Sequence, residues 1–189
     1  MQTHTLPTIH SVLEYWAKKE PEAPFVITGE HFCSMGYLDE QYTKLANSLQ
    51  ALGVKKGDMV AVMMAGSIEY LTVWFAISKI GAVEVPINNA YKGFLLEHVI
   101  KTTNLQTVVL DFEFSNVMES AFENLGQSCN IISNNGAGGK SLKALIEEGK
   151  NNELNTDVLS TDIACVLFTS GTTGPSKGVL MSHGHALVL

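Results

Sequence analysis

The chain has 189 residues, of which 46% are hydrophobic and 16% are charged, and this composition supplies a packed core and excludes a disordered chain. The chain has 12 lysine and arginine residues and 19 aspartate and glutamate residues, which gives a formal net charge of −7. A surface with this charge repels polyphosphate backbones, so we expect no binding of nucleic acid.

Apolar runs and cysteines exclude further classes of protein. The longest strongly apolar run, 70–77, is far shorter than the roughly 20 residues of a membrane helix, and the first residues lack the pattern of a secretory signal. We therefore expect no transmembrane segment and a cytoplasmic location. The three cysteines, Cys33, Cys129 and Cys165, are odd in number and share no metal-ligand spacing. This predicts free thiols in a reducing compartment and no metal site.

Helical and strand patterns alternate along the chain. Apolar residues at Ile9, Val12, Leu13, Trp16 and Ala17 recur with helical spacing, which predicts a first amphipathic helix that ends before Pro21. Further helices are expected at 38–52, 68–80, 94–103, 115–125 and 142–148, and strands at 25–28, 59–64, 83–85, 107–110, 130–132 and 163–169. A loop rich in glycine and asparagine is expected at 134–139, and a polar connection at 151–162.

The order of these elements predicts an α/β fold, layered, with a largely parallel sheet and flanking helices. The strand at 163–169 is apolar along most of its length. We expect it to be a central strand that is paired on both edges and covered on both faces.

The segment that follows this strand is a candidate phosphate-binding loop. Its glycines let backbone N–H groups approach an anion, its hydroxyls add donors, and one lysine adds a positive charge. The candidate binding residues are Thr169, Ser170, Gly171, Thr172, Thr173, Gly174 and Lys177. A simple turn between two strands would share much of this composition. A buried strand, a dense run of hydroxyls and a lysine within eleven residues favour the phosphate loop.

A second candidate loop covers residues 134–141 and ends in Gly139, Lys140 and Ser141. It has Asn134 where the Walker pattern G-x-x-x-x-G-K-[ST] has its first glycine. One alternative function is therefore a Walker-type nucleotide-binding NTPase or kinase that uses Lys140. The other interpretation of this segment is a surface loop with Ser141 near the start of the next helix. A non-catalytic phosphate-binding or assembly module is a further alternative.

Residues 169–179, Thr-Ser-Gly-Thr-Thr-Gly-Pro-Ser-Lys-Gly-Val, resemble the signature T-S-G-[ST]-T-G-x-P-K-G-V of the adenylate-forming superfamily. This superfamily contains acyl-CoA synthetases, luciferases and the adenylation domains of peptide synthetases. The match departs at Ser176, where the family usually has proline. Residues 52–61 and 79–88 are similar to the family patterns L-G-x-x-x-G-D-x-V-A and K-x-G-A-x-x-x-P-[IVL]-N, so the resemblance spans almost the whole chain. The sequence of residues 84–93 most resembles that of bacterial acyl-CoA ligases of the carnitine/crotonobetaine type.

The resemblance implies an acid–thiol ligase, an acyl-CoA synthetase with a place in fatty acid metabolism. Such enzymes use Mg-ATP to convert a carboxylic acid into an acyl-adenylate and pyrophosphate, and the thiol of CoA then displaces AMP. The implied cofactors are ATP, Mg²⁺ and CoA. By the same resemblance, 169–177 hold the β- and γ-phosphates, with Thr172 and Thr173 as hydroxyl donors, and Lys177 is the catalytic residue that neutralises the departing pyrophosphate. Ser182-His183-Gly184-His185 stands where the family often has T-H-x-N, and an active-site role and a structural or capping role are both open for the two histidines.

The resemblance further implies that residues 1–189 are the N-terminal part of the adenylation domain. The family's magnesium-binding glutamate, ribose-binding aspartate and lid lysine would follow Leu189. The expectation is therefore an incomplete domain without the C-terminal lid domain, inactive by itself. Because strand 163–169 would then lack part of its cover, we expect the chain to self-associate.

Overall fold

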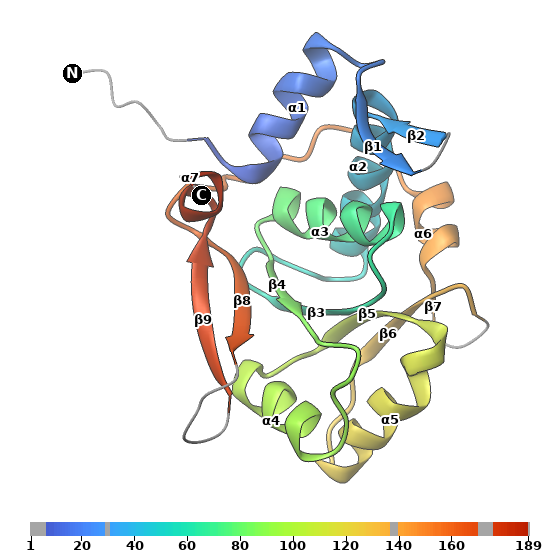
Figure 1. Cartoon of the computed structure of the whole chain (residues 1–189), viewed down its shortest axis with the longest axis vertical. Coiled ribbons are helices and arrows are strands. Elements are labelled where there is room, and N and C mark those ends of the chain that lie inside the picture. The colour runs from blue at the N-terminus through green and yellow to red at the C-terminus, as the bar shows by residue number, and fades with distance from the viewer. Residues whose placement is uncertain (1–6, 29–30, 137–139, 170–175, 189) are drawn as a thin grey trace.

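The computed structural model describes residues 7–28, 31–136, 140–169 and 176–188 (Figure 1). The helices are α1 (Ile9–Lys19), α2 (Met35–Ala51), α3 (Ile68–Ile80), α4 (Phe94–Thr103), α5 (Ser115–Asn124), α6 (Leu142–Glu148) and α7 (His183–Val188). The strands are β1 (Pro24–Thr28), β2 (His31–Ser34), β3 (Met59–Met63), β4 (Val83–Pro86), β5 (Thr107–Asp111), β6 (Asn130–Asn134), β7 (Lys140–Ser141), β8 (Ile163–Thr169) and β9 (Lys177–Ser182). A short 3₁₀ turn, Phe112–Phe114, links β5 to α5.

The main sheet has the strand order β7-β6-β5-β3-β4-β8-β9. All its neighbouring strands are parallel except β8 and β9, which pair antiparallel. Helices α1, α2, α3 and α6 cover one face, and α4 and α5 cover the other (Figure 1). Strands β1 and β2 form a separate antiparallel pair. The α/β class, the layers and the largely parallel sheet are therefore confirmed.

The core consists of two apolar clusters, one on each face of the sheet. Along β3, Val60 and Val62 belong to the cluster under α1, α2 and α3, while Ala61 and Met63 belong to the cluster over α4 and α5. This follows from the period of two in a strand, where successive side chains point to opposite faces. Because both faces are covered, β3 is apolar at every position, as the sequence indicates.

Capping residues set several helix ends. The Ser34 hydroxyl accepts a hydrogen bond from the Tyr37 N–H at 3.3 Å at the start of α2, and Ser67 does the same for Tyr70 at 3.1 Å at the start of α3. Helix α3 ends at Gly81, whose φ of +71° is in the left-handed region that favours glycine. None of the helices in the described part of the chain is long and apolar enough to cross a membrane.

The structure adds five elements that the sequence patterns did not predict: β2, β7, β9, α7 and the 3₁₀ turn Phe112–Phe114. Strand β9 was missed because Lys177 to Leu180 are exposed, so that no alternation of burial marks it. Strand 163–169 was expected to pair with a neighbour on both edges, and this is confirmed, because β8 lies between β4 and β9. Its cover is incomplete: Ala164, Cys165 and Val166 are buried, whereas Leu167 and Thr169 are exposed.

Candidate phosphate-binding site

The β8–β9 hairpin brings the two ends of the predicted phosphate loop together. Thr169 is the last residue of β8, Lys177 is the first residue of β9, and the two are direct cross-strand partners. Directly opposite residues in an antiparallel pair have Cα atoms about 4.5–5.5 Å apart. The remaining predicted members, Ser170, Gly171, Thr172, Thr173 and Gly174, lie outside the described residues.

The charge of Lys177 is free for an anion in the described part of the chain. Its side chain is exposed at the hairpin end, and none of the ion pairs formed there includes it. An exposed ammonium beside the Thr169 hydroxyl can neutralise and hydrogen-bond a phosphate oxygen.

Gly178 allows the two strands to approach closely next to Lys177. A Cβ atom at this position would lie 2.8 Å from Cγ1 of the buried Val166. Gly178 is also the cross-strand partner of Phe168. The glycine after the lysine is thus required by packing at the base of the hairpin.

His98 is a part of this region that the sequence patterns missed, as is the burial of Ser176, a residue of the predicted loop. The Ser176 side chain is buried, and its hydroxyl has no partner among the described residues. The Ser176 carbonyl accepts a hydrogen bond from His98 Nε2 on α4 at 2.8 Å. The two residues are 78 positions apart, and no spacing or motif links them in the sequence.

Lys140 and Ser141, at the end of the second candidate loop, are placed differently from the lysine and the hydroxyl residue of a Walker loop. In that motif the lysine lies at the start of the helix that follows the loop, where backbone N–H groups point at the phosphates. Here Lys140 lies in the two-residue strand β7, and Ser141 caps α6 by accepting from the Ala144 N–H at 3.3 Å. This placement contradicts the Walker alternative at Lys140 and supports the interpretation of Ser141 as a residue at a helix start.

The two histidines that follow β9, His183 and His185, lie in the first turn of α7. His183 is fully buried, and its Nδ1 accepts a hydrogen bond from the Ile9 N–H at 3.4 Å, which ties α7 to α1. Burial lowers the pKa of His183 below its ordinary value. The His185 N–H donates to the Ser182 hydroxyl at 3.2 Å, a capping contact at the start of α7. The structure therefore supports the structural interpretation for His183, whereas at His185 the capping side chain is that of Ser182 and the role of the imidazole stays open.

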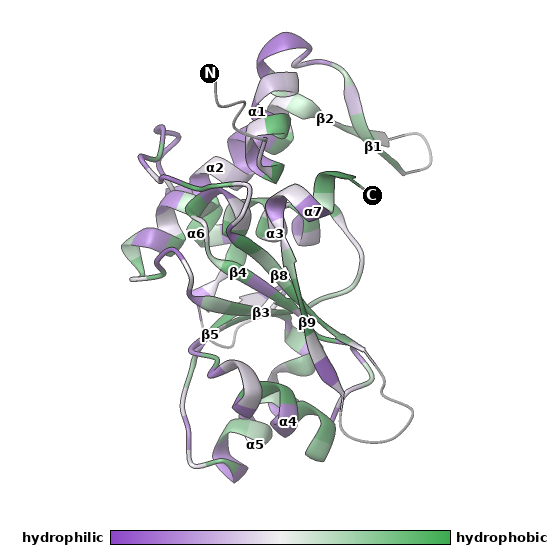
Figure 2. Cartoon of the chain, turned by 90° about the vertical axis from the view of Figure 1, so that its left-hand side faces the viewer, coloured by the Kyte–Doolittle hydropathy of each residue, from purple (hydrophilic) through white to green (hydrophobic). Residues whose placement is uncertain are grey.

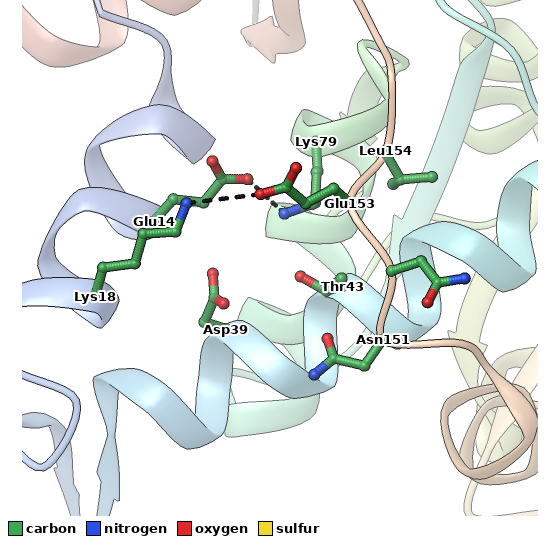
Figure 3. Close-up of a pocket in the computed structure, with 9 residues that line it drawn as sticks. Glu14, Lys18, Asp39, Thr43, Lys79, Asn151, Glu153 and Leu154 are labelled. Carbon is green, nitrogen blue, oxygen red and sulfur yellow. Dashed lines mark hydrogen bonds and ion pairs between the residues drawn. The ribbon is translucent and has the colours of Figure 1, made fainter.

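A polar pocket of about 300 Å³ lies elsewhere, between α1, α2, α3 and the segment 151–154 (Figure 3). Four of its charged groups form two ion pairs, Lys79 with Glu14 and Lys18 with Glu153 at 3.9 Å, and Asp39 accepts a hydrogen bond from the Tyr42 hydroxyl. None of its lining residues belongs to β8 or β9. Its charges hold neighbouring elements together, and the pocket is separate from the phosphate-loop hairpin.

Comparisons with known proteins show the family of this chain. The profile of the AMP-binding enzyme family matches residues 13–189. A crotonobetaine/carnitine CoA ligase from Salmonella paratyphi A is 32% identical over 157 residues, which cover 79% of this chain and 30% of that protein. The phosphinothricin tripeptide synthetase PhsC from Streptomyces viridochromogenes is 27% identical over 176 residues, which cover 93% of this chain and 15% of that protein.

A solved structure shows the same fold. The anthranilate CoA ligase AuaEII in complex with anthranoyl-AMP superposes with a TM-score of 0.87 at 24% identity, over 95% of this chain and 35% of that one. The present chain therefore spans about a third or less of the length of these three proteins.

Proposed function

The chain belongs to the AMP-binding enzyme family, and from this premise we propose that it carries the phosphate-binding part of an ATP-dependent acid–thiol ligase. In this reaction a carboxylate oxygen of the acid attacks the α-phosphorus of ATP, and the bond to the leaving pyrophosphate breaks. The thiolate of CoA then attacks the acyl carbon of the adenylate, and AMP leaves with the bonding electrons. The observation that carries the proposal is the pairing of Thr169 with Lys177 at an exposed hairpin end.

The proposed roles follow from the chemistry of the residues. The hydroxyl and backbone N–H groups of 169–174 would hold the β- and γ-phosphates. Lys177 would neutralise the charge that develops on the departing pyrophosphate, which lowers the barrier because this charge is larger in the transition state than in bound ATP. A lysine suits this task as a compact point charge on a flexible stem.

ATP and CoA are the proposed cosubstrates, and Mg²⁺ the proposed metal. Among the described residues, no three His, Cys, Asp or Glu side chains gather into a metal site. We therefore derive no step through Mg²⁺ and assign it no ligand from this part of the chain. The carboxylic acid is the proposed substrate, with fatty acid metabolism as its proposed setting.

Location and assembly belong to the same proposal. Cys33, Cys129 and Cys165 are all free thiols, which suits the reducing cytoplasm. Self-association is proposed because β9 pairs only with β8 among the described strands and exposes Val179 and Leu180.

Binding of Mg-ATP and of Mg-pyrophosphate by calorimetry tests the proposal. A charge-assisted contact to phosphate contributes about 1.5–3 kcal/mol, so Lys177→Ala should weaken binding roughly 10- to 100-fold. Lys140→Ala is the matched control, since it removes the same charge from an exposed strand outside the hairpin, and it should leave binding unchanged. Equal losses in both variants, or no nucleotide binding by the unmodified chain, would contradict the proposal.

A further inference from the structure

His98 lies on helix α4 and contacts the phosphate-loop hairpin at Ser176, the residue before Lys177. Helix α4 lies beside the loop end of β8 and β9 in both views (Figures 1 and 2). From it, the His98 Nε2 reaches the Ser176 carbonyl oxygen at 2.8 Å. A carbonyl oxygen only accepts hydrogen bonds, so Nε2 must carry the proton, which defines the tautomer of a neutral His98.

Two aromatic rings hold the imidazole in place. Phe94, one turn earlier on α4, stacks on it with ring centroids 6.3 Å apart and an interplanar angle of 22°. Phe168 on β8 packs edge-on at 6.2 Å and 85°. The ring is thus oriented by α4 on one side and by the hairpin itself on the other, which reduces the entropy lost when the hydrogen bond forms.

The tethered carbonyl belongs to the peptide group that precedes Lys177. A peptide unit is planar, so the Ser176 C=O and the Lys177 N–H move as one body. None of the described peptide bonds is cis, and in a trans unit the N–H points away from the carbonyl. A hydrogen bond to the Ser176 oxygen therefore also sets the direction of the Lys177 N–H and the position of the Lys177 Cα, from which the side chain extends.

On the Ser176 side of this peptide group, the hydrogen bond from His98 is the polar contact that the described residues supply. The Ser176 hydroxyl is buried without a partner among the described residues, so the side chain does not anchor the residue. Ser176 also precedes the first cross-strand pair, Thr169 with Lys177. The sheet restrains this peptide group through Lys177, and the contact from α4 restrains it through the Ser176 carbonyl.

We infer that His98 is a positioning residue, which orients Lys177 for phosphate by holding the Ser176–Lys177 peptide group from α4. The inference rests on the proposed function, because it concerns the residue proposed to neutralise pyrophosphate. His98 itself touches no reacting atom, and its effect passes through the peptide.

Two substitutions separate the hydrogen bond from the packing. His98→Phe keeps an aromatic ring between Phe94 and Phe168 but cannot donate. His98→Gln loses the ring but keeps an N–H₂ donor on a side chain of similar reach. A purely structural role predicts that Phe is the better replacement, whereas a positioning role predicts that Gln is.

The first measurement needs no ligand. Nitrogen NMR of the labelled chain should show His98 as the Nε2–H tautomer, with slow exchange of that proton. His98→Phe should shift the amide resonances of Lys177 and Gly178 and speed their hydrogen exchange, and His98→Gln should restore both. An Nδ1–H tautomer, or unchanged amides in His98→Phe, would overturn the inference whatever the chain binds.

The second measurement is the affinity for Mg-pyrophosphate and Mg-ATP. A single neutral hydrogen bond is worth about 0.5–1.5 kcal/mol, so His98→Phe should weaken binding about 2- to 10-fold and His98→Gln should recover most of it. Binding that is as tight in His98→Phe as in the unmodified chain would overturn the role. If the unmodified chain shows the NMR signature but binds neither ligand, the proposed function fails, and His98 is then a structural contact only. Thermal unfolding of both variants checks that the fold is retained.

Discussion

The Tyr70 hydroxyl on α3 donates a hydrogen bond to the carboxylate of Glu84 on β4, with Oη and Oε1 2.8 Å apart. Glu84 is 3% exposed and lies at the centre of the sheet, opposite Val60 of β3 and Cys165 of β8. Burial raises the pKa of Glu84 to about 7, although the hydrogen bond from Tyr70 opposes this shift. An ionisable carboxyl group is thus part of the core, and its hydrogen-bond donor is the neutral Tyr70 hydroxyl.

This burial predicts a pH-dependent stability. The folded chain holds the Glu84 proton more tightly than the unfolded chain, so the stabilisation is fully present below pH 4.5, the ordinary value, and is lost as the pH rises to about 7. The loss is about 1.4 kcal/mol for each pH unit in that window. Glu84→Gln keeps an acceptor for Tyr70 and removes the titration, so it should gain stability relative to the unmodified chain as the pH rises.

Urea unfolding at pH 5, 6, 7 and 8 measures this difference. Taking the difference between the two chains cancels the titration of the other groups they share. Tyr70→Phe is a second check, because removal of the donor should raise the pKa of Glu84 further and move the window to higher pH. Parallel stability curves for the unmodified chain and Glu84→Gln would show that Glu84 does not titrate in this range.

A second prediction concerns the close contact beside Lys177. Gly178→Ala places a methyl group against Val166 Cγ1 in the core, and overpacking of this kind costs about 1–3 kcal/mol. In a Val166→Ala background the space is open, so the added methyl group should cost little. Denaturant unfolding of the four chains forms a double-mutant cycle. Additive losses would show that the contact does not limit residue 178.

The ion pair of Lys79 and Glu14 is the basis of a third prediction. The Lys79 side chain is only 8% exposed and also lies 5.3 Å from the centre of the Tyr42 ring. Lys79→Met leaves Glu14 unpaired in a partly buried site, and we expect a loss of about 1–3 kcal/mol in unfolding free energy. Lys18→Met is the control, since its pair with Glu153 is largely exposed and should contribute little. Similar losses in both variants would contradict the prediction.

The thiols give a fourth prediction. Burial raises the pKa of Cys129 and of Cys165 to about 11, and also raises that of Cys33. Since the thiolate is the reactive form, a disulfide reagent at pH 8 should react slowly with the folded chain, and first with the half-buried Cys129. In denaturant, without reductant, all three thiols should react at once. Fewer than three would reveal a disulfide.

Self-association can be tested at β9. Val179 and Leu180 are 47% and 59% exposed on a strand whose outer edge is unpaired among the described residues. Light scattering at rising concentration should show association, and Leu180→Lys should reduce it because a charge on an edge strand opposes strand pairing. A monomer at every concentration tested would mean that this edge does not associate.

Much of the fold could be predicted from local chemistry. The helices at 68–80 and 94–103 were predicted with the bounds that the structure has, because helix period, capping and terminal glycines act over a few residues. The apolar run of β3 indicated a strand covered on both faces, since strands of a parallel sheet are usually buried on both sides. The phosphate-loop motif is equally local, being a run of eleven residues after one strand.

Other features depend on contacts between distant parts of the chain. No pattern in 177–182 marks β9, because its side chains are exposed and only pairing with β8 makes it a strand. The tether from His98 to Ser176 and the burial of Glu84 beside Tyr70 arise when α3 and α4 pack on opposite faces of the sheet. Hydrogen bonds and desolvation act over a few ångströms in space, whereas sequence periodicity reports only a residue's neighbours along the chain. For that reason the motif could be located from the sequence, while the groups that orient it and the pKa values around it came from the packing.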